Sequence, residues 1–220
     1  LIKMGAKIEG HGTKTILVQG VTNLKKAEHE IISDRIVAGT YIIAALMLNS
    51  ALEINNFNTI YLKSLIDILK KMGAKLKVSK NSIKVSKGSK LKSTSLSTSP
   101  YPGFPTDLQA QLMSLMCISD GKSKIKETIF ENRFMHVPEL NRLGANITVE
   151  KDTATIIGNQ TFKGAQVMAS DLRASISLVL AAMNANGQTT LNRVYHLDRG
   201  YENIEKTLGS LGAKIKRQKN

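Results

Sequence analysis

The chain has 220 residues, 42% of them hydrophobic, and a formal net charge of +14 at pH 7. This length can bury one sizeable core, or one core plus a fragment of a second, and no stretch approaches the roughly 18 consecutive apolar residues of a membrane span. The single cysteine, Cys117, excludes an internal disulfide framework and the first residues lack the features of a signal peptide, so we expect a cytoplasmic protein without a membrane partner.

A phrase Leu-x-x-(Leu/Met)-Gly-Ala recurs along the chain, and recurrence at a near-constant period is the signature of a repeated structural unit. Its copies begin at Leu1, Leu69, Leu140 and Leu208. The first copy has no capped helix before it, so we expect residues 1–28 to be the remnant of a preceding partner domain. Residues 29–220 then form a domain of three units, and the chain is a fragment whose N-terminal half-domain is missing.

The remnant carries apolar residues that have lost the sheet they would complete. These residues are Ile8, Ile16, Leu17 and Val18. Unpaired strand edges recruit partners, so we expect the fragment to associate with itself.

Each unit opens with Ser or Thr followed by Asp, at positions 33, 106 and 170, and then by an apolar run. Ser and Thr are preferred N-caps and Asp suits the first turn, and Gln109, three residues after Thr106, completes a capping box. We therefore predict helices at residues 36–48, 108–118 and 172–183. Helices this apolar are buried on most sides, so we expect them to bundle at a shared centre.

A short strand should follow each apolar helix, at residues 51–55, 123–129 and 188–194. The Gly-Ala phrase should close a second helix, with Gly73, Gly144 and Gly212 in the left-handed position after it. A hairpin follows, clearest at residues 145–149 and 154–157. The fold class is therefore α/β, with three βαβαββ-like repeats around buried helices.

The basic charge is densest at residues 63–92, where lysines alternate with apolar residues and no aromatic occurs. Binding of single-stranded nucleic acid needs aromatic stacking platforms among the cations, whereas this alternation is typical of the solvated face of a hairpin. We therefore expect no nucleic-acid partner, although the face could attract anionic substrates.

Four stretches are longer than the repeat requires. They read Phe-Pro-Thr-Asp-Leu-Gln-Ala-Gln at 104–111, Glu-Asn-Arg-Phe-Met-His-Val-Pro-Glu-Leu at 131–140, Gly-Ala-Gln-Val-Met-Ala-Ser-Asp-Leu-Arg-Ala-Ser at 164–175 and Tyr-His-Leu-Asp-Arg-Gly-Tyr-Glu at 195–202. The chain resembles the enolpyruvyl transferases over nearly its whole length, and within them the UDP-N-acetylglucosamine branch more than the enolpyruvylshikimate-phosphate branch.

The resemblance implies an inside-out α/β barrel of the enolpyruvyl transferase type. It also implies transfer of the enolpyruvyl group of phosphoenolpyruvate to the 3′-hydroxyl of UDP-N-acetylglucosamine, the first committed step of peptidoglycan and cell wall synthesis, without metal or other cofactor. A fragment alone should be inactive. The alternatives are an enolpyruvylshikimate-phosphate synthase-like transferase and a non-catalytic basic binding domain.

Asp107 matches the position that the family uses as a base near the sugar hydroxyl; without the resemblance it would read as a helix-start carboxylate, like Asp34. Arg133 and Arg199 belong to the second and third units, and the first unit has no arginine at the matching position. Their planar guanidinium groups suit phosphate and carboxylate, and the family uses both against phosphoenolpyruvate. The alternative for these arginines is a surface ion pair, with Glu131 or Asp198.

The resemblance implies that Ile129 and Phe130 contact the sugar nucleotide, and that Asp171 and Arg173 lie near the reacting centre, although these last two could also form an internal pair. His196 is either part of the loop packing or a support of the site. Cys117 lies within an apolar run and is predicted to be a core thiol rather than a catalytic one.

Overall fold

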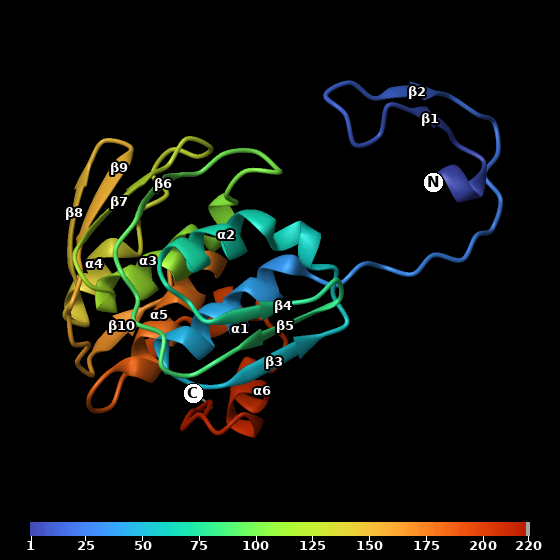
Figure 1. The fold of residues 1–220 in the computed structure, drawn as a ribbon. Coiled ribbons are helices and arrows are strands. Elements are labelled where there is room, and N and C mark those ends of the chain that lie inside the picture. The colour runs from blue at the N-terminus through green and yellow to red at the C-terminus, as the bar shows by residue number, and fades with distance from the viewer. Residues whose placement is uncertain (219–220) are drawn as a thin grey trace. The chain divides into compact units, whose positions relative to one another are not determined.

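The computed structural model describes residues 1–218, and it divides into two compact units, Leu1–Ser33 and a second unit that begins at Asp34 (Figure 1). The first unit holds a 3₁₀ turn, η1 (Ile2–Met4), and a hairpin of β1 (Lys7–Glu9) and β2 (Leu17–Gln19). The strands are antiparallel, with Ile8 opposite Val18. The side chains of Leu17 and Val18 are exposed.

The centre of the second unit is formed by three apolar helices, α1 (Arg35–Met47), α3 (Gln109–Ile118) and α5 (Leu172–Asn184). Each contacts the other two, as their apolar sequences predicted. Gly39 lies at a close approach within this core, because a Cβ there would meet the side chain of Leu108 at 2.8 Å.

The helix starts differ from the prediction in which residue provides the cap. Asp34 and Asp171, rather than the preceding serines, cap α1 and α5, and each accepts hydrogen bonds from two backbone amides of its own helix. The capping box predicted at Thr106 and Gln109 is wrong. Thr106 begins a 3₁₀ turn, η3 (Thr106–Leu108), and its hydroxyl donates to Glu127 instead.

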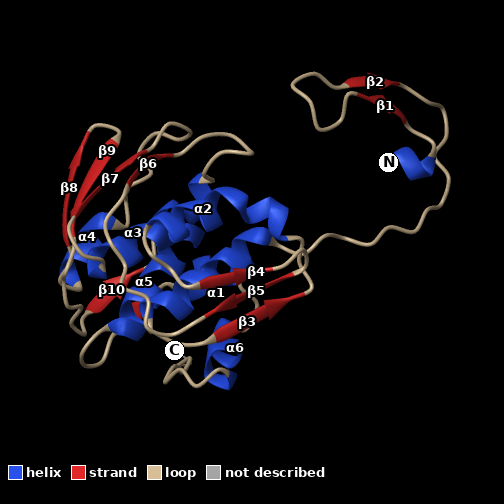
Figure 2. Cartoon of the chain, viewed as in Figure 1, coloured by secondary structure: helices blue, strands red, loops and turns tan. Residues whose placement is uncertain are grey.

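Two larger sheets lie around the helices (Figure 2). One has the order β3 (Leu52–Asn55), β5 (Ser82–Val85), β4 (Leu76–Val78), and the other the order β6 (Ser95–Ser97), β7 (Lys122–Lys126), β9 (Thr153–Ile157), β8 (Asn146–Glu150). A parallel pair joins β10 (Gln166–Met168) to β11 (Thr190–Asn192). The predicted hairpin is present as β8 and β9.

Shorter helices complete the unit, and three of them end at the predicted glycines. These elements are η2 (Thr59–Leu62), α2 (Lys63–Lys71), α4 (Val137–Arg142), η4 (Val194–Arg199) and α6 (Ile204–Ser210). Gly73, Gly144 and Gly212 follow α2, α4 and α6 with φ of 98°, 102° and 97°, so the left-handed closure is confirmed.

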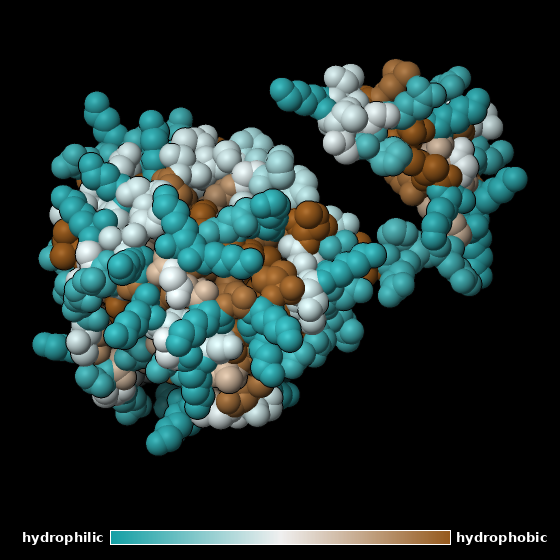
Figure 3. Space-filling model, viewed as in Figure 1, coloured by the Kyte–Doolittle hydropathy of each residue, from teal (hydrophilic) through white to brown (hydrophobic). Residues whose placement is uncertain are grey.

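The lysines of the β4–β5 hairpin lie on its solvated side. Lys77 and Lys84 are exposed and face each other across the two strands, whereas Ile83 and Val85 are buried. Hydrophilic side chains project over much of the face of this unit in Figure 3. The solvated lysine face predicted for residues 63–92 is therefore confirmed at β4 and β5, whereas Lys63–Lys71 forms a helix. Among residues 1–218, no helix has both the length and the apolar character to cross a bilayer.

Candidate active site

Asp107 differs from the other two aspartates that open an apolar helix. The 3₁₀ turn η3 precedes α3, and no side chain caps either element. The carboxylate of Asp107 therefore makes no cap hydrogen bond of the kind that Asp34 and Asp171 make. Its backbone carbonyl is held by Gln111, whose Nε2 donates to Asp107 O at 2.9 Å.

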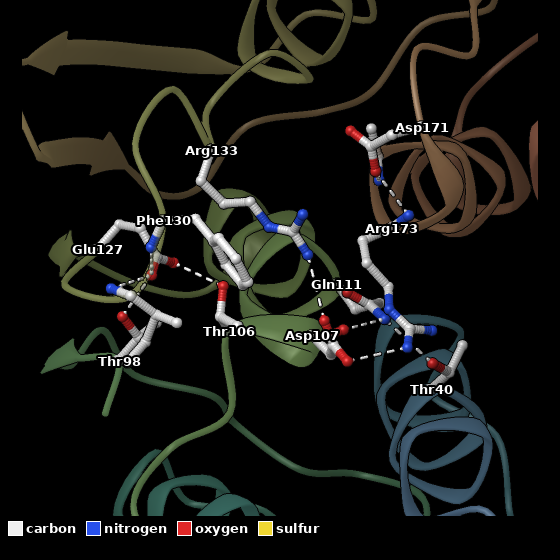
Figure 4. Close-up of polar contacts among 12 residues, drawn as sticks. Thr40, Thr98, Thr106, Asp107, Gln111, Glu127, Phe130, Arg133, Asp171 and Arg173 are labelled. Atoms are coloured by element: carbon white, nitrogen blue, oxygen red, sulfur yellow. Dashed lines mark hydrogen bonds and ion pairs between the residues drawn. The ribbon is translucent and has the colours of Figure 1, made fainter. Parts of the chain in front are cut away.

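Two arginines bind the carboxylate of Asp107, which caps no helix, and each arginine contacts one of its oxygens (Figure 4). Arg133 Nη2 lies 3.2 Å from Oδ1 and Arg173 Nη2 lies 3.0 Å from Oδ2. The Asp107 side chain is 39% exposed, and the arginine side chains are 23% and 18% exposed. The three groups form a solvent-accessible cluster that we call the Asp107 cluster.

Arg133 reaches the cluster from the loop between β7 and α4. Its guanidinium lies 5.4 Å from the centre of the Phe130 ring, a cation–π distance, and Phe130 is exposed. Ile129 is partly buried beside it. The alternative of an ion pair between Arg133 and Glu131 is wrong, because Arg133 pairs with Asp107.

Arg173 enters from the first turn of α5, and it links Asp171 to Asp107. Its backbone amide donates to Asp171 Oδ1 at 2.8 Å, whereas its guanidinium reaches Asp107. His136, which directly precedes α4, is buried. The pKa of His136 is lowered to about 4 in total. Burial is the largest cause and Arg133 also lowers the pKa, whereas the Asp171 carboxylate raises it.

Arg199 does not join the Asp107 cluster in this structure. It ends η4, its side chain is exposed, and within the described part of the chain no hydrogen bond or ion pair connects its guanidinium group to another residue. The alternative pairing with Asp198 is also wrong, because Asp198 binds Arg217 through two bonds of 2.9 and 2.6 Å.

Residues 1–208 match the sequence model of one protein family, EPSP synthase (3-phosphoshikimate 1-carboxyvinyltransferase). The chain belongs to the EPSP synthase family. The curated relatives include the UDP-N-acetylglucosamine 1-carboxyvinyltransferases of Pelagibacter ubique and Azorhizobium caulinodans, each 52% identical over 99% of this chain. The chain spans 52% and 51% of their lengths, which is about half of each relative.

Solved structures of this family show the same fold. The enolpyruvyl transferase NikO from Streptomyces tendae superposes with a TM-score of 0.89 at 30% identity, over 98% of this chain and 52% of NikO. EPSP synthase from Acinetobacter baumannii gives a TM-score of 0.77 at 17% identity, over all of this chain and 54% of its own. Mixed α/β structure of the enolpyruvyl transferase kind is therefore established for this chain.

The remaining predicted residues of this EPSP synthase family chain are not members of the Asp107 cluster. Cys117 is fully buried in α3, and burial raises the pKa of its thiol to about 12, so it is a core thiol. His196 stacks against Tyr195 with ring centres 4.2 Å apart. Within residues 1–218, no group of three or more His, Cys, Asp or Glu side chains could hold a metal ion.

Sequence reasoning missed two groups that support the cluster. Glu127 is a buried carboxylate that binds the segments on both sides of the cluster. Thr40 and Tyr201 form a buried hydroxyl pair, 2.8 Å apart, that also contacts Gln111. The side-chain partners of Glu127 lie 29 and 21 residues away in sequence, and Thr40 and Tyr201 are 161 positions apart, so no local pattern marks these contacts.

Proposed function

We propose that this chain supplies one half of the active site of a transferase that moves the enolpyruvyl group of phosphoenolpyruvate to the 3′-hydroxyl of UDP-N-acetylglucosamine and releases phosphate. The observation that carries the proposal is the carboxylate of Asp107, which is free of its helix and held by Arg133 and Arg173. The names of the 52% identical relatives support this acceptor.

The proposed reaction is an addition followed by an elimination. The sugar hydroxyl oxygen bonds to C2 of phosphoenolpyruvate while its proton passes to a base, and C3 gains a proton to become a methyl group. In the second step, C2 loses phosphate and the methyl group loses a proton, so the double bond returns. The reaction needs general acid–base groups and cationic partners for the phosphate and carboxylate.

The residues of this chain divide between these tasks. Asp107 takes the proton of the sugar hydroxyl, and Arg133, Arg173 and Arg199 bind the anionic groups of the substrates. Asp171 holds the turn from which Arg173 projects. Ile129 and Phe130 contact the sugar nucleotide. The guanidinium groups that flank the Asp107 carboxylate are already in place before the substrates bind. They can therefore serve as donors to the substrate anions.

We also propose the finer description of the fold. Residues 29–220 form three repeat units in an inside-out barrel, residues 1–28 belong to a preceding domain, and a second half-domain completes the site. The helix contacts among α1, α3 and α5 support the repeat. Self-association through Leu17, Val18 and their neighbours stays a prediction.

The test is to join this chain to the half of the Pelagibacter ubique relative that the match does not cover. The joined protein should release phosphate from phosphoenolpyruvate when UDP-N-acetylglucosamine is present, and the 220-residue chain alone should not. Shikimate 3-phosphate is the control acceptor. Turnover with shikimate 3-phosphate but not with the sugar nucleotide would overturn the assignment of substrate.

A further inference from the structure

We infer that Glu127 is a positioning residue of the proposed transferase, whose buried carboxylate fixes the turn that carries Asp107 to the loop that carries Phe130 and Arg133. The inference rests on the proposed function. It concerns a residue outside the Asp107 cluster, which acts on the cluster through its neighbours.

Glu127 is 4% exposed, and its two oxygens accept four hydrogen bonds from three segments (Figure 4). Oε1 accepts from Thr98 Oγ1 at 2.8 Å, from the backbone amide of Ile129 at 2.9 Å and from that of Phe130 at 3.4 Å. Oε2 accepts from Thr106 Oγ1 at 3.0 Å. All four partners donate, so both oxygens act as the acceptors of a carboxylate.

The partners of Glu127 adjoin the residues of the cluster. Thr106 directly precedes Asp107 in η3, and Phe130 lies three residues before Arg133 and under its guanidinium. One carboxylate therefore joins the two segments that must hold Asp107 and Arg133 at 3.2 Å.

A second layer of hydrogen bonds stabilises this arrangement. Thr98 accepts from the amide of Thr128 at 2.8 Å, and the Thr128 hydroxyl donates to Thr98 O at 2.6 Å. No Lys or Arg pairs with Glu127 among residues 1–218. A buried carboxylate without a cationic partner is stable only when hydrogen bonds replace its hydration. The four hydrogen bonds of Glu127 therefore keep its carboxylate buried and hold the three segments together.

Replacement of Glu127 should disturb the geometry without removing any group of the cluster. In Glu127→Gln one oxygen becomes an NH₂ group, which can only donate, so the Thr106 hydroxyl has to turn and accept from it, and the amides of Ile129 and Phe130 lose a charged acceptor. The bonds that hold the Ile129–Phe130 segment and the Thr106 turn are then weaker, so both segments are held less firmly. Misplacement on the order of 1 Å at a reacting group can cost about 10²-fold in rate.

The first arm of the test uses the 220-residue chain and nuclear magnetic resonance. The amide-proton signals of Ile129 and Phe130 should move upfield in Glu127→Gln, because they lose a charged acceptor, and the guanidinium signal of Arg133 should shift. Glu131→Gln, an exposed change in the same loop, should leave them in place. Unchanged signals in Glu127→Gln would overturn the inference.

The second arm uses the joined protein described above. Glu127→Gln should lower kcat by about 10²-fold, with a smaller change in the KM for phosphoenolpyruvate, and Glu131→Gln should retain wild-type kcat. If Glu127→Gln does not fold, Thr106→Val removes one bond to the carboxylate and should lower kcat in the same direction. Wild-type kcat in the folded variant would overturn the inference. An inactive wild-type joined protein would instead refute the proposed function, and the first arm would then decide alone whether Glu127 holds the two segments.

Discussion

Arg173 Nη2 lies 3.0 Å from Asp107 Oδ2, although the two residues are 66 positions apart in sequence. The bond joins the first turn of α5 to the turn before α3, so the packing of these two helices determines whether the cluster forms. Asp107 has this partner because its own helix does not use its carboxylate, in contrast to Asp34.

This contrast gives a matched pair of substitutions. In the joined protein, Asp107→Ala should lower kcat by roughly 10²–10⁴-fold, the usual cost of losing a general base, with little loss of stability, because partly exposed ion pairs contribute about 0–1 kcal/mol. Asp34→Ala should leave kcat unchanged and cost about 1 kcal/mol of stability, since it removes a cap.

Steady-state kinetics and urea unfolding of both variants provide the measurement. Equal losses of turnover in the two variants, or full activity in Asp107→Ala, would contradict the role assigned to Asp107. If the chain instead binds DNA with an affinity that falls steeply with salt and Asp107→Ala leaves this binding unchanged, the alternative of a basic binding domain gains support.

The sequence predicted the elements whose cause is local. The apolar helices and the closures at Gly73 and Gly144 depend on apolar content and on one backbone conformation, and the structure places both close to their predicted positions. The predicted strand at residues 123–129 ends at Lys126, and Glu127, which is buried like Ser123 and Ile125, binds Thr98 and Thr106. A local pattern carries no information about such a distant partner.

The cluster was predictable only in part for the same reason. The resemblance picked out Asp107, Arg133 and Arg173, but the direction in which each guanidinium points depends on helix packing and loop geometry. The sequence predicts a cap at Thr106, because Ser and Thr commonly cap helices. In the folded chain, the buried carboxylate of Glu127 is the partner of this hydroxyl.

Burial of His136 predicts a loss of stability in mild acid. Its pKa falls from 6.5 to about 4 in the folded chain, chiefly through burial, so the unfolded chain takes up a proton between these values that the folded chain does not. The stabilisation is present above pH 6.5 and is lost as the pH falls toward 4. Urea unfolding at pH 7 and pH 4.5 should show a fall of up to about 3 kcal/mol from this group. His136→Gln should reduce that fall, and an equal fall in both proteins would contradict the prediction.

Two helix-closing glycines allow backbone strain to be separated from steric contact. Both have a left-handed φ, 98° at Gly73 and 97° at Gly212, so alanine at either position carries a backbone cost of about 1–2 kcal/mol. A Cβ at Gly73 would also lie 2.7 Å from Lys90 O, whereas a Cβ at Gly212 meets nothing within 4 Å. Urea unfolding should therefore show a larger loss for Gly73→Ala than for Gly212→Ala. Equal losses would show that the chain near Lys90 moves aside without cost.

The thiol of Cys117 should be inert in the folded chain. It is fully buried, its Sγ donates to Met113 O at 3.3 Å, and burial raises its pKa from 9.0 to about 12. Because the thiolate is the reactive form, iodoacetamide at pH 8 should leave the native chain unmodified and should alkylate one site after unfolding in urea, as measured by intact mass.

The raised pKa of the Cys117 thiol also makes the stability of the chain depend on pH. The stabilisation is present below pH 9 and is lost as the pH rises toward 12, because only the unfolded chain releases the proton in that range. Cys117→Ala should remove this alkaline loss, at the cost of a small cavity in α3, and should leave the kcat of the joined protein unchanged. Rapid alkylation of the native chain, together with loss of activity, would show that this cysteine is accessible and would contradict its assignment to the core.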